Sequence, residues 1–276
     1  MQPVPPASPS KQVCGPAPTA SGQRTTSPLP PGPRAAGPHP RVSISGTRYR
    51  KVMEPRTTAD GSLTLYSPAY GQTLHSHHGA VTESRHVFLR GSGVASRLGL
   101  GRPTSVLEIG FGTGLNFLLS ADAALATGTP LRYVALDRSL PDSDLLATLG
   151  YGRHLSNSQL WTRFLTFRGS LEANPTFHYG PARLSLQLRD ATGAPLEAED
   201  FDAIYLDAFS PDVNPELWSE AFLSGLATAL SAGGILVSYS VKGEVRRRLA
   251  RLGLEVARHP GPPAGKREML WARKRT

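Results

Sequence analysis

The sequence predicts a doubly wound α/β domain, in which helices cover both faces of a mostly parallel sheet. Strand-like and helix-like segments alternate from about residue 99 to the end of the chain. A glycine-rich turn joins the first of these strands directly to a helix, and acidic residues end several of the strands. Ligands bind at the carboxyl edge of open α/β sheets, so these observations also predict where a site lies.

The chain is predicted to have three parts: a proline-rich tail at residues 1–42, a small lead-in at residues 43–98, and the main domain at residues 99–276. The first 40 residues contain 12 of the 25 prolines and no Asp or Glu. Such a segment cannot bury enough apolar surface to offset the entropy of ordering, so we expect disorder there. Cys14 is the single cysteine, which excludes an intramolecular disulfide and a multi-cysteine metal site.

The lead-in is predicted to hold a hairpin and a helix. Residues 63–66 and 72–75 form the strands of the hairpin, and residues 67–71 form its turn. Residues 80–89 follow as a helix, because apolar side chains recur there at helical spacing and Gly91 can end the helix.

The main domain is predicted to contain strands at residues 105–109, 131–136, 182–188, 202–206 and 234–240. Helices are predicted at residues 115–126, 142–149, 158–164, 215–230 and 243–252. Two further strands, at residues 254–258 and 269–274, close the chain. The loop between them is too short for a parallel crossover, so they must be antiparallel. A parallel sheet that ends in a reversed strand is typical of methyltransferases rather than of dehydrogenases.

The glycine turn predicts a cofactor site. Glu108 ends the first strand, Gly110, Gly112 and Gly114 follow at every second position, and the helix that contains Asn116 begins at once. Glycines permit positive φ and a close approach of ligand to backbone, and the helix start offers free N–H groups. The dinucleotide fingerprint is G-x-G-x-x-G, so this different spacing favours a Rossmann-like fold whose cofactor has no phosphates. We expect these five residues to bind the cofactor, although a glycine turn can also be purely structural.

Carboxylates at the ends of successive strands indicate a nucleoside. Asp137 is placed to accept hydrogen bonds from ribose hydroxyls, and Asp190 to accept one from an adenine amine. Asp207 ends the next strand. Any one of these residues has an alternative interpretation as a helix cap or a solvated turn. Together with Glu108 and the glycine turn, they favour a binding site.

The chain is strongly basic, with a net charge of +9 and a pI near 10.0. This charge suits a polyanionic partner such as nucleic acid, although a genome rich in arginine codons produces the same excess. One helix carries a basic face, made of Arg246, Arg247, Arg248 and Arg251. That face is equally consistent with a solvated surface.

The motifs resemble a known family. Residues 108–117, followed by D-A-F-S-P-D-V-N-P-E-L-W at residues 207–218, are similar to the methyltransferase module of the bifunctional protein that synthesises 5-methylaminomethyl-2-thiouridine in tRNA. The similarity also includes T-L-Y-S at residues 64–67, E-S-R-H-V-F-L at residues 83–89 and G-K-R-E-M-L at residues 265–270. It covers roughly residues 60–274.

The resemblance implies that S-adenosyl-L-methionine is the cofactor and that the substrate is the 5-aminomethyl group of the wobble uridine in the tRNA anticodon stem-loop. Asp207 would be the catalytic residue, holding the amine and accepting or relaying its proton, or only orienting it. Glu83 would reach the methionine ammonium of the cofactor. The substrate-binding residues would be Phe209, Pro211, Asn214, Trp218, Tyr239, Lys266 and Arg267. Trp218 has an alternative interpretation as a buried helix residue.

Two departures from the family accompany the resemblance. No oxidase module follows Thr276, which predicts a stand-alone methyltransferase whose aminomethyl substrate comes from a separate enzyme. The second strand is followed by D-R-S-L-P at residues 137–141, which keeps an acid–base pair but shifts the proline of the family's E-K-x-P.

Alternatives on the same fold are an aminopropyltransferase of the spermidine-synthase kind and a non-catalytic nucleic-acid-binding module. The intact glycine turn with Asp137 and Asp207 opposes the second. His75, His77 and His78 lack a fourth ligand at suitable spacing, so no metal is expected. Neither a signal segment nor a membrane span is evident, so a cytoplasmic location without membrane association is expected.

Overall fold

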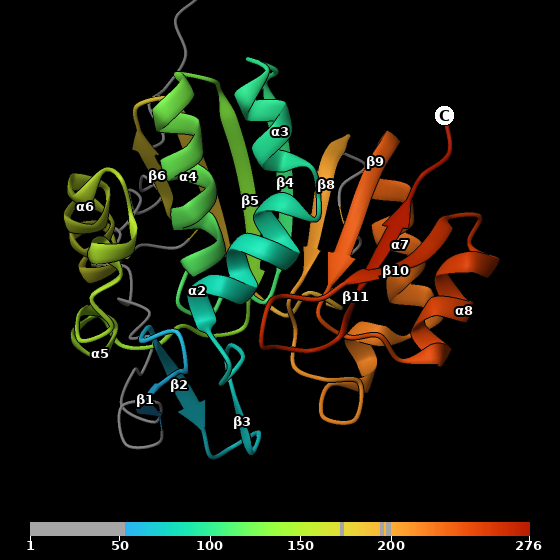
Figure 1. Cartoon of the computed structure of the whole chain (residues 1–276), viewed down its shortest axis with the longest axis horizontal. Coiled ribbons are helices and arrows are strands. Elements are labelled where there is room, and N and C mark those ends of the chain that lie inside the picture. Colours follow the sequence, from blue (N-terminus) through green and yellow to red (C-terminus); the bar gives the residue numbers. More distant parts are fainter. Residues whose placement is uncertain (1–52, 172–173, 194–195, 197–199) are drawn as a thin grey trace, which may run out of the picture. The chain divides into compact units, whose positions relative to one another are not determined.

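A computed structural model describes residues 53–171, 174–193, 196 and 200–276 (Figure 1). The predicted tail at residues 1–42, Cys14 and the start of the predicted lead-in lie outside the described residues. None of the helices in the described ranges is long and apolar enough to cross a membrane.

The described part of the main domain is built on an eight-stranded sheet with the order β10-β11-β9-β8-β4-β5-β7-β6. Its strands, in chain order, are β4 (Thr104–Ile109), β5 (Leu131–Asp137), β6 (Thr176–Tyr179), β7 (Ala182–Leu188), β8 (Phe201–Leu206), β9 (Leu230–Ser238), β10 (Glu255–Pro260) and β11 (Glu268–Arg273). Strands β4, β5, β7, β8 and β9 pair in parallel, whereas β6 runs antiparallel to β7.

The predicted reversed strand is confirmed. Strand β11 lies between β9 and β10 and pairs antiparallel to both, because the short loop after β10 returns the chain beside it. The expected doubly wound α/β class is therefore the observed one. Successive residues of the central strands face opposite cores: Val106 belongs to one and Leu107 to the other.

Helices cover both faces of the sheet. They are α3 (Val94–Gly99), α4 (Leu115–Thr127), α5 (Ser143–Ala147), α6 (Ser158–Gly169), α7 (Glu220–Ala229) and α8 (Gly243–Arg251), with single 3₁₀ turns at η2 (Tyr151–His154) and η3 (Pro215–Trp218). Figure 1 shows α3 and α4 in front of the sheet. Side chains of α7 and α8 pack into the core on the opposite face, where Leu223 and Leu249 are fully buried.

A small antiparallel sheet precedes the main domain. Its strands are β1 (Glu54–Thr57), β2 (Leu63–Ser67) and β3 (Gln72–Thr73). The predicted hairpin is confirmed as β2 and β3, but β3 ends two residues early and β1 was not predicted. Since all four side chains of β1 are exposed, no alternation of apolar and polar residues marks it.

The predicted helix after the hairpin has two parts. Helix α2 (Ala80–Glu83) continues as the π-helix η1 (Ser84–Arg90), in which the Gly91 N–H donates to the carbonyl of His86. This wider turn differs from the uniform 3.6-residue period on which the prediction rested.

The predicted helix at residues 215–230 is wrong at both ends. The chain turns once in η3 and starts again at Ser219, whose hydroxyl accepts the N–H of Phe222 at 3.2 Å and caps α7. Leu230 already belongs to β9, which begins four residues before the predicted strand. Helix α3 and the short edge strand β6 were also missed, since segments of four to six residues show little periodicity.

An aromatic cluster fills the core under α4. Phe117 lies at ring-centroid distances of 5.2 Å from Tyr133 and 5.9 Å from both Phe164 and Phe177. The contacts join α4 to β5, α6 and β6, so this one side chain connects four elements of the same face.

We expect Phe117→Ala to lower the free energy of unfolding by about 3–5 kcal/mol, because it removes a fully buried ring and leaves a cavity. Urea unfolding measures the change. Leu100→Ala is the control, since Leu100 is 66% exposed and its loss should change stability by less than about 0.5 kcal/mol. Equal effects of the two substitutions would contradict the assignment of this core.

Candidate cofactor and amine site

A cavity of about 510 Å³ lies at the carboxyl ends of the parallel strands. Its walls come from the glycine turn after β4, the chain after β5, β7 and β8, and the small sheet that Figure 1 shows beneath those strand ends. The volume is within the range of small-molecule sites, and the position is where open α/β sheets bind ligands. Of the predicted site residues, those that line it are Glu83, Gly110, Gly112, Asp137, Asp190, Asp207, Phe209, Asn214, Tyr239 and Lys266.

The glycine turn is shaped by close backbone contacts. Gly110 has φ +90°, and a Cβ there would lie 2.6 Å from the carbonyl oxygen of Asp207. Gly112 has φ +52°, and its N–H donates to Asp137 Oδ2 at 2.8 Å. The turn therefore both leaves space for a ligand and fixes the carboxylate at the end of β5.

Asp137 has the geometry expected of a ribose acceptor. Its two oxygens each accept one backbone N–H, from Gly112 at 2.8 Å and from Ser139 at 3.1 Å. A carboxylate has about four acceptor positions, so further positions remain for a diol. Burial raises the pKa of Asp137, and the two backbone hydrogen bonds oppose that rise.

Asp190 lines the cavity, but its carboxylate is heavily engaged. One oxygen accepts the N–H and the hydroxyl of Thr192, at 2.9 and 2.8 Å, and the other forms an ion pair with Arg138 at 2.6 Å. The hydrogen bonds from Thr192 and the pairing with Arg138 lower the pKa of Asp190. Arg138 also reaches Glu216 at 3.4 Å, so it links the chain segments after β5, β7 and β8.

Asn116 joins two carboxyl groups at the centre of the site. Its side-chain nitrogen donates to Glu108 Oε1 and to Asp207 Oδ2, both at 2.8 Å. Tyr133 donates to the other oxygen of Glu108 at 2.9 Å. Both of the hydrogens on Asn116 are therefore used to hold acids in place, and the residue does not line the cavity.

Glu108 was expected to contact the cofactor, but the structure places it under the glycine turn, fully buried and outside the cavity lining. The reason is the alternation of side chains along β4, which directs this one into the core. Burial raises the pKa of Glu108 to about 8, against the hydrogen bonds from Asn116 and Tyr133.

Asp207 lines the cavity, and two acids, Glu108 and Glu83, lie near enough to affect its pKa. Burial raises the pKa of Asp207 well above its usual value, and the charges of Glu108 and Glu83 raise it further. Asn116 and Lys266 act in the opposite direction. Glu83 is itself buried, and its Oε2 accepts the N–H of Ser76 at 2.8 Å.

Aromatic side chains form part of the cavity wall. Phe209 stacks on Tyr70 with ring centroids 4.2 Å apart and an interplanar angle of 25°. Tyr239 donates its hydroxyl to the carbonyl of Ala208 at 2.8 Å, which fixes the ring beside the chain segment that carries Asp207.

Four other predicted site residues do not line the cavity: Gly114, Pro211, Trp218 and Arg267. Trp218 is fully buried, and its indole N–H donates to the carbonyl of Phe209 at 2.9 Å. Its ring therefore supports the loop from beneath and has no free face for stacking. A Cβ on Gly114 would lie 2.7 Å from the ring of Phe164, so this glycine serves the packing of the turn on α6.

The wall contributed by the small sheet was missed from the sequence. Tyr66, Tyr70, Gln72 and Leu74 line the cavity. Gln72 donates to the hydroxyl of Ser210 at 2.9 Å, which joins β3 to the segment after β8. Gln72 and Ser210 lie more than 130 residues apart in the sequence, so no pattern of neighbouring residues predicts their contact.

The side chains of His75, His77 and His78 do not converge on a common metal position. Buried His75 contacts the Thr64 hydroxyl through Nδ1 at 3.1 Å, and burial lowers its pKa to about 4. The rings of His77 and His78 lie 4.0 Å apart. Within the described ranges, no group of three or more His, Cys, Asp and Glu side chains is placed to hold a metal ion.

The chain is similar to several known proteins. A sequence profile for an S-adenosyl-L-methionine-dependent methyltransferase matches residues 156–275. The tRNA 5-methylaminomethyl-2-thiouridine biosynthesis bifunctional protein MnmC of Cupriavidus metallidurans is 35% identical over 239 residues, which cover 82% of this chain and 34% of that protein. The MnmC protein of Aromatoleum aromaticum is 36% identical over 233 residues, covering 79% and 35%. This chain thus spans about a third of the length of these relatives.

Among solved structures, the crystal structure of MNMC2 from Aquifex aeolicus superposes on this chain with a TM-score of 0.67. The two sequences are 27% identical, and the match covers 80% of this chain and 70% of the other.

Buried Glu108 makes stability depend on pH. The folded protein keeps this proton up to about pH 8, whereas the unfolded chain releases it near pH 4.5. The free energy of unfolding should therefore fall as the pH rises through that window, by at most about 1.4 kcal/mol per pH unit from this group. In urea unfolding, Glu108→Gln should flatten the slope, whereas the exposed control Glu244→Gln should keep it. An unchanged slope in Glu108→Gln would contradict the raised pKa.

The shape of the glycine turn predicts a second result. Gly110→Ala should weaken the binding of S-adenosylmethionine by at least about tenfold. The added methyl group would lie 2.6 Å from the carbonyl oxygen of Asp207, so the glycine turn and the chain at Asp207 must move apart. Gly101→Ala is the control, since Gly101 has φ +68° with open space around it and should lose only about 1–2 kcal/mol of stability. Calorimetric titration checks affinity, and equal affinities in both variants would oppose a cofactor role for the turn.

Proposed function

Because the chain belongs to the S-adenosyl-L-methionine-dependent methyltransferases and is related to the MnmC proteins, we propose that it methylates the 5-aminomethyl group of the wobble uridine in tRNA, giving 5-methylaminomethyluridine. The observation that carries the proposal is a pair of acids, half-buried Asp207 and buried Glu83, that line the same cavity as the glycine turn. Such a site attracts a cationic amine and can accept its proton.

The cavity fits S-adenosylmethionine. Gly110 and Gly112 have no side chains, so a nucleoside can approach the backbone closely at this turn. Asp137 retains acceptor positions for ribose hydroxyls. One carboxylate oxygen of Glu83 accepts the N–H of Ser76 at 2.8 Å, and the other can meet the ammonium of the methionine part. We propose these residues, with Asp190 at the adenine end, as the cofactor contacts.

S-adenosylmethionine supplies a methyl group already activated on a sulfonium, whose carbon–sulfur bond breaks with its electron pair left on sulfur as the amine nitrogen bonds to the methyl carbon. The protein must first make the nitrogen a nucleophile. Asp207 accepts one proton from the substrate ammonium, which leaves a neutral amine with a free lone pair. After the transfer the nitrogen carries the positive charge as a secondary ammonium, and Asp207 returns its proton to water.

The placement of Asp207 suits this work. Asn116 fixes one carboxylate oxygen of Asp207 at 2.8 Å, and Asp207 lines the cavity. Burial and the neighbouring acids raise the pKa of Asp207, which brings its basicity nearer to that of the amine. Alignment of amine and methyl group can supply much of the remaining acceleration.

The aromatic pair of Phe209 and Tyr70 is the proposed platform for the unpaired anticodon base, since bases of single-stranded RNA stack on aromatic faces. Asn214 and Lys266 line the same cavity, and Asn214 is proposed as a further substrate contact.

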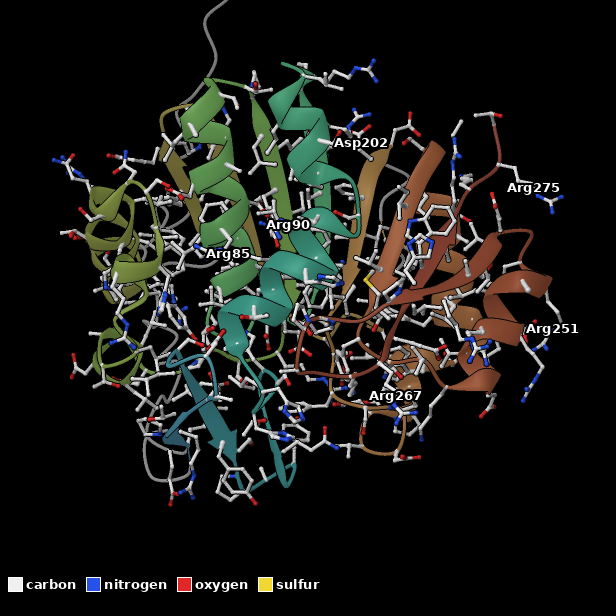
Figure 2. The ribbon with its side chains drawn as sticks, viewed as in Figure 1. Arg85, Arg90, Asp202, Arg251, Arg267 and Arg275 are labelled. Carbon is white, nitrogen blue, oxygen red and sulfur yellow. The ribbon has the colours of Figure 1, made fainter. Side chains whose placement is uncertain are left out.

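The basic surface supports an RNA partner, although part of it is neutralised. Arg248 pairs with Glu244, and Arg251 pairs with Glu220 at 2.6 Å. Arg251 and Arg275 point outward from the ribbon in Figure 2. We propose Arg267, which is exposed beside the cavity residue Lys266, as a phosphate contact.

Two further points follow from the proposed substrate. The aminomethyl group must exist before it can be methylated, so we propose that another active site makes it. Since tRNA is the proposed substrate, we also propose the cytoplasm as the place of action.

The test is transfer of labelled methyl from S-adenosylmethionine to tRNA that carries 5-aminomethyluridine, followed by nucleoside analysis. Asp207→Ala should lower kcat by about 10²–10⁴-fold, because the general base is lost, while the affinity for S-adenosylmethionine persists. Asp212→Asn is the matched control, since Asp212 is an exposed carboxylate paired with Lys242, and it should keep full activity. Label that enters polyamines instead of tRNA would overturn the proposed substrate, and loss of cofactor binding in Asp207→Ala would move this residue among the cofactor contacts.

A further inference from the structure

Lys266, an exposed residue, places a positive charge at the wall of the cavity. It lies in the loop between β10 and β11, lines the cavity, and holds its Nζ 4.3 Å from the ring centroid of Tyr239. The loop is closed on itself, because the Gly261 N–H donates to the carbonyl of Arg267 at 2.9 Å and the Gly265 N–H to that of Pro262 at 3.0 Å. The ammonium therefore has a defined location on the ring face, typical of a cation–π contact.

The charges around Lys266 come from several elements. Partial burial lowers the pKa of Lys266, and the charges of Glu83 from α2 and of Asp207 after β8 oppose that decrease. Glu108 lies beneath Asp207 and acts on it. Tyr239 faces the ammonium with its ring.

Other titratable groups share the cavity wall. Asp137, Arg138, Arg189 and Asp190 lie on the β5 and β7 side. His75, His77 and His78 lie after β3, and His86 contacts the Pro260 carbonyl where β10 ends.

The acids alone would work against catalysis. Two carboxylates around an amine stabilise its ammonium form, which binds well but has no lone pair for the methyl group. A fixed cation nearby has the opposite effect, since it repels the ammonium and leaves the neutral amine unaffected.

We propose that Lys266 is a resident cation of the reaction site, which repels a bound ammonium and so favours the neutral, nucleophilic form of the substrate amine. The inference rests on the proposed function and deepens it. Lys266 is a positioning residue in this scheme: it neither donates nor accepts the transferred proton, and the methyl group passes to the amine as described above. The charge of Lys266 also repels the cationic sulfonium of S-adenosylmethionine. The product S-adenosylhomocysteine has an uncharged thioether sulfur at that position, which the charge does not repel.

This difference between cofactor and product gives a test that requires no RNA. The affinities for S-adenosylmethionine and S-adenosylhomocysteine are measured by calorimetry in the wild type and in Lys266→Met, which keeps the aliphatic stem and removes the charge. We expect the affinity ratio to shift toward S-adenosylmethionine by about fivefold in the variant. Lys266→Arg should restore the wild-type ratio.

The second readout is the pH dependence of kcat on an anticodon stem-loop that carries 5-aminomethyluridine. Without the cation the bound ammonium keeps its proton to higher pH, so the midpoint of the rising limb should move up by about one pH unit in Lys266→Met. Arg163→Met removes the same charge from an exposed position on α6, outside the cavity, and should leave both the midpoint and the affinity ratio unchanged.

The outcomes separate the two proposals. An unchanged affinity ratio in Lys266→Met would overturn the resident cation, and so would a raised KM with an unmoved midpoint, which would make Lys266 an RNA contact. If the wild type transfers no label to the RNA while the ratio still shifts, the proposed substrate fails and the resident cation stands.

Discussion

The side chain of Asn116 is the contact on which the site depends. Its amide has two hydrogens, and each holds a carboxyl group: Glu108 in the core and Asp207 at the cavity wall. Two acids this close repel each other when both are ionised, and the amide between them offsets part of that repulsion, because its hydrogen bonds lower the pKa of each acid. The glycine turn, the end of β8 and the first turn of α4 all meet at this bridge. The geometry of the cofactor wall and that of the reacting end are therefore fixed together.

Much of the fold was predictable from the sequence, because its central strands are nearly continuous apolar runs and its turns carry glycine. The reversed strand β11 followed from loop length alone. Strand β1 escaped prediction because all four of its side chains are exposed and it has no apolar period to detect. Strand β6 does alternate, with Phe177 buried, but four residues are too few for a period to stand out. Ser219 was equally invisible, because a cap in the middle of an apolar segment breaks a helix without changing its composition.

The candidate site divides in the same way. The acids and glycines at the strand ends were found because chain order places strand ends together. The spacing of residues did not predict the direction of each side chain. Glu108 faces the core, and Trp218 lies beneath the loop that it was expected to cover from the cavity side. Gln72 and Tyr70 were missed for another reason, since they join the site through contacts between distant parts of the chain.

The stacked rings of Tyr70 and Phe209 have a consequence for selectivity. The two rings already stack on each other, so a base that bound as proposed would exchange a ring–ring contact for a ring–base contact, and the gain in affinity would be correspondingly small. Every base has a π-face, so such a surface hardly distinguishes one base from another. For the proposed substrate, discrimination would then come from the substituent that enters the acidic cavity. An enzyme with the proposed function would read a previous chemical modification, and the identity of the neighbouring nucleotides would matter little to it.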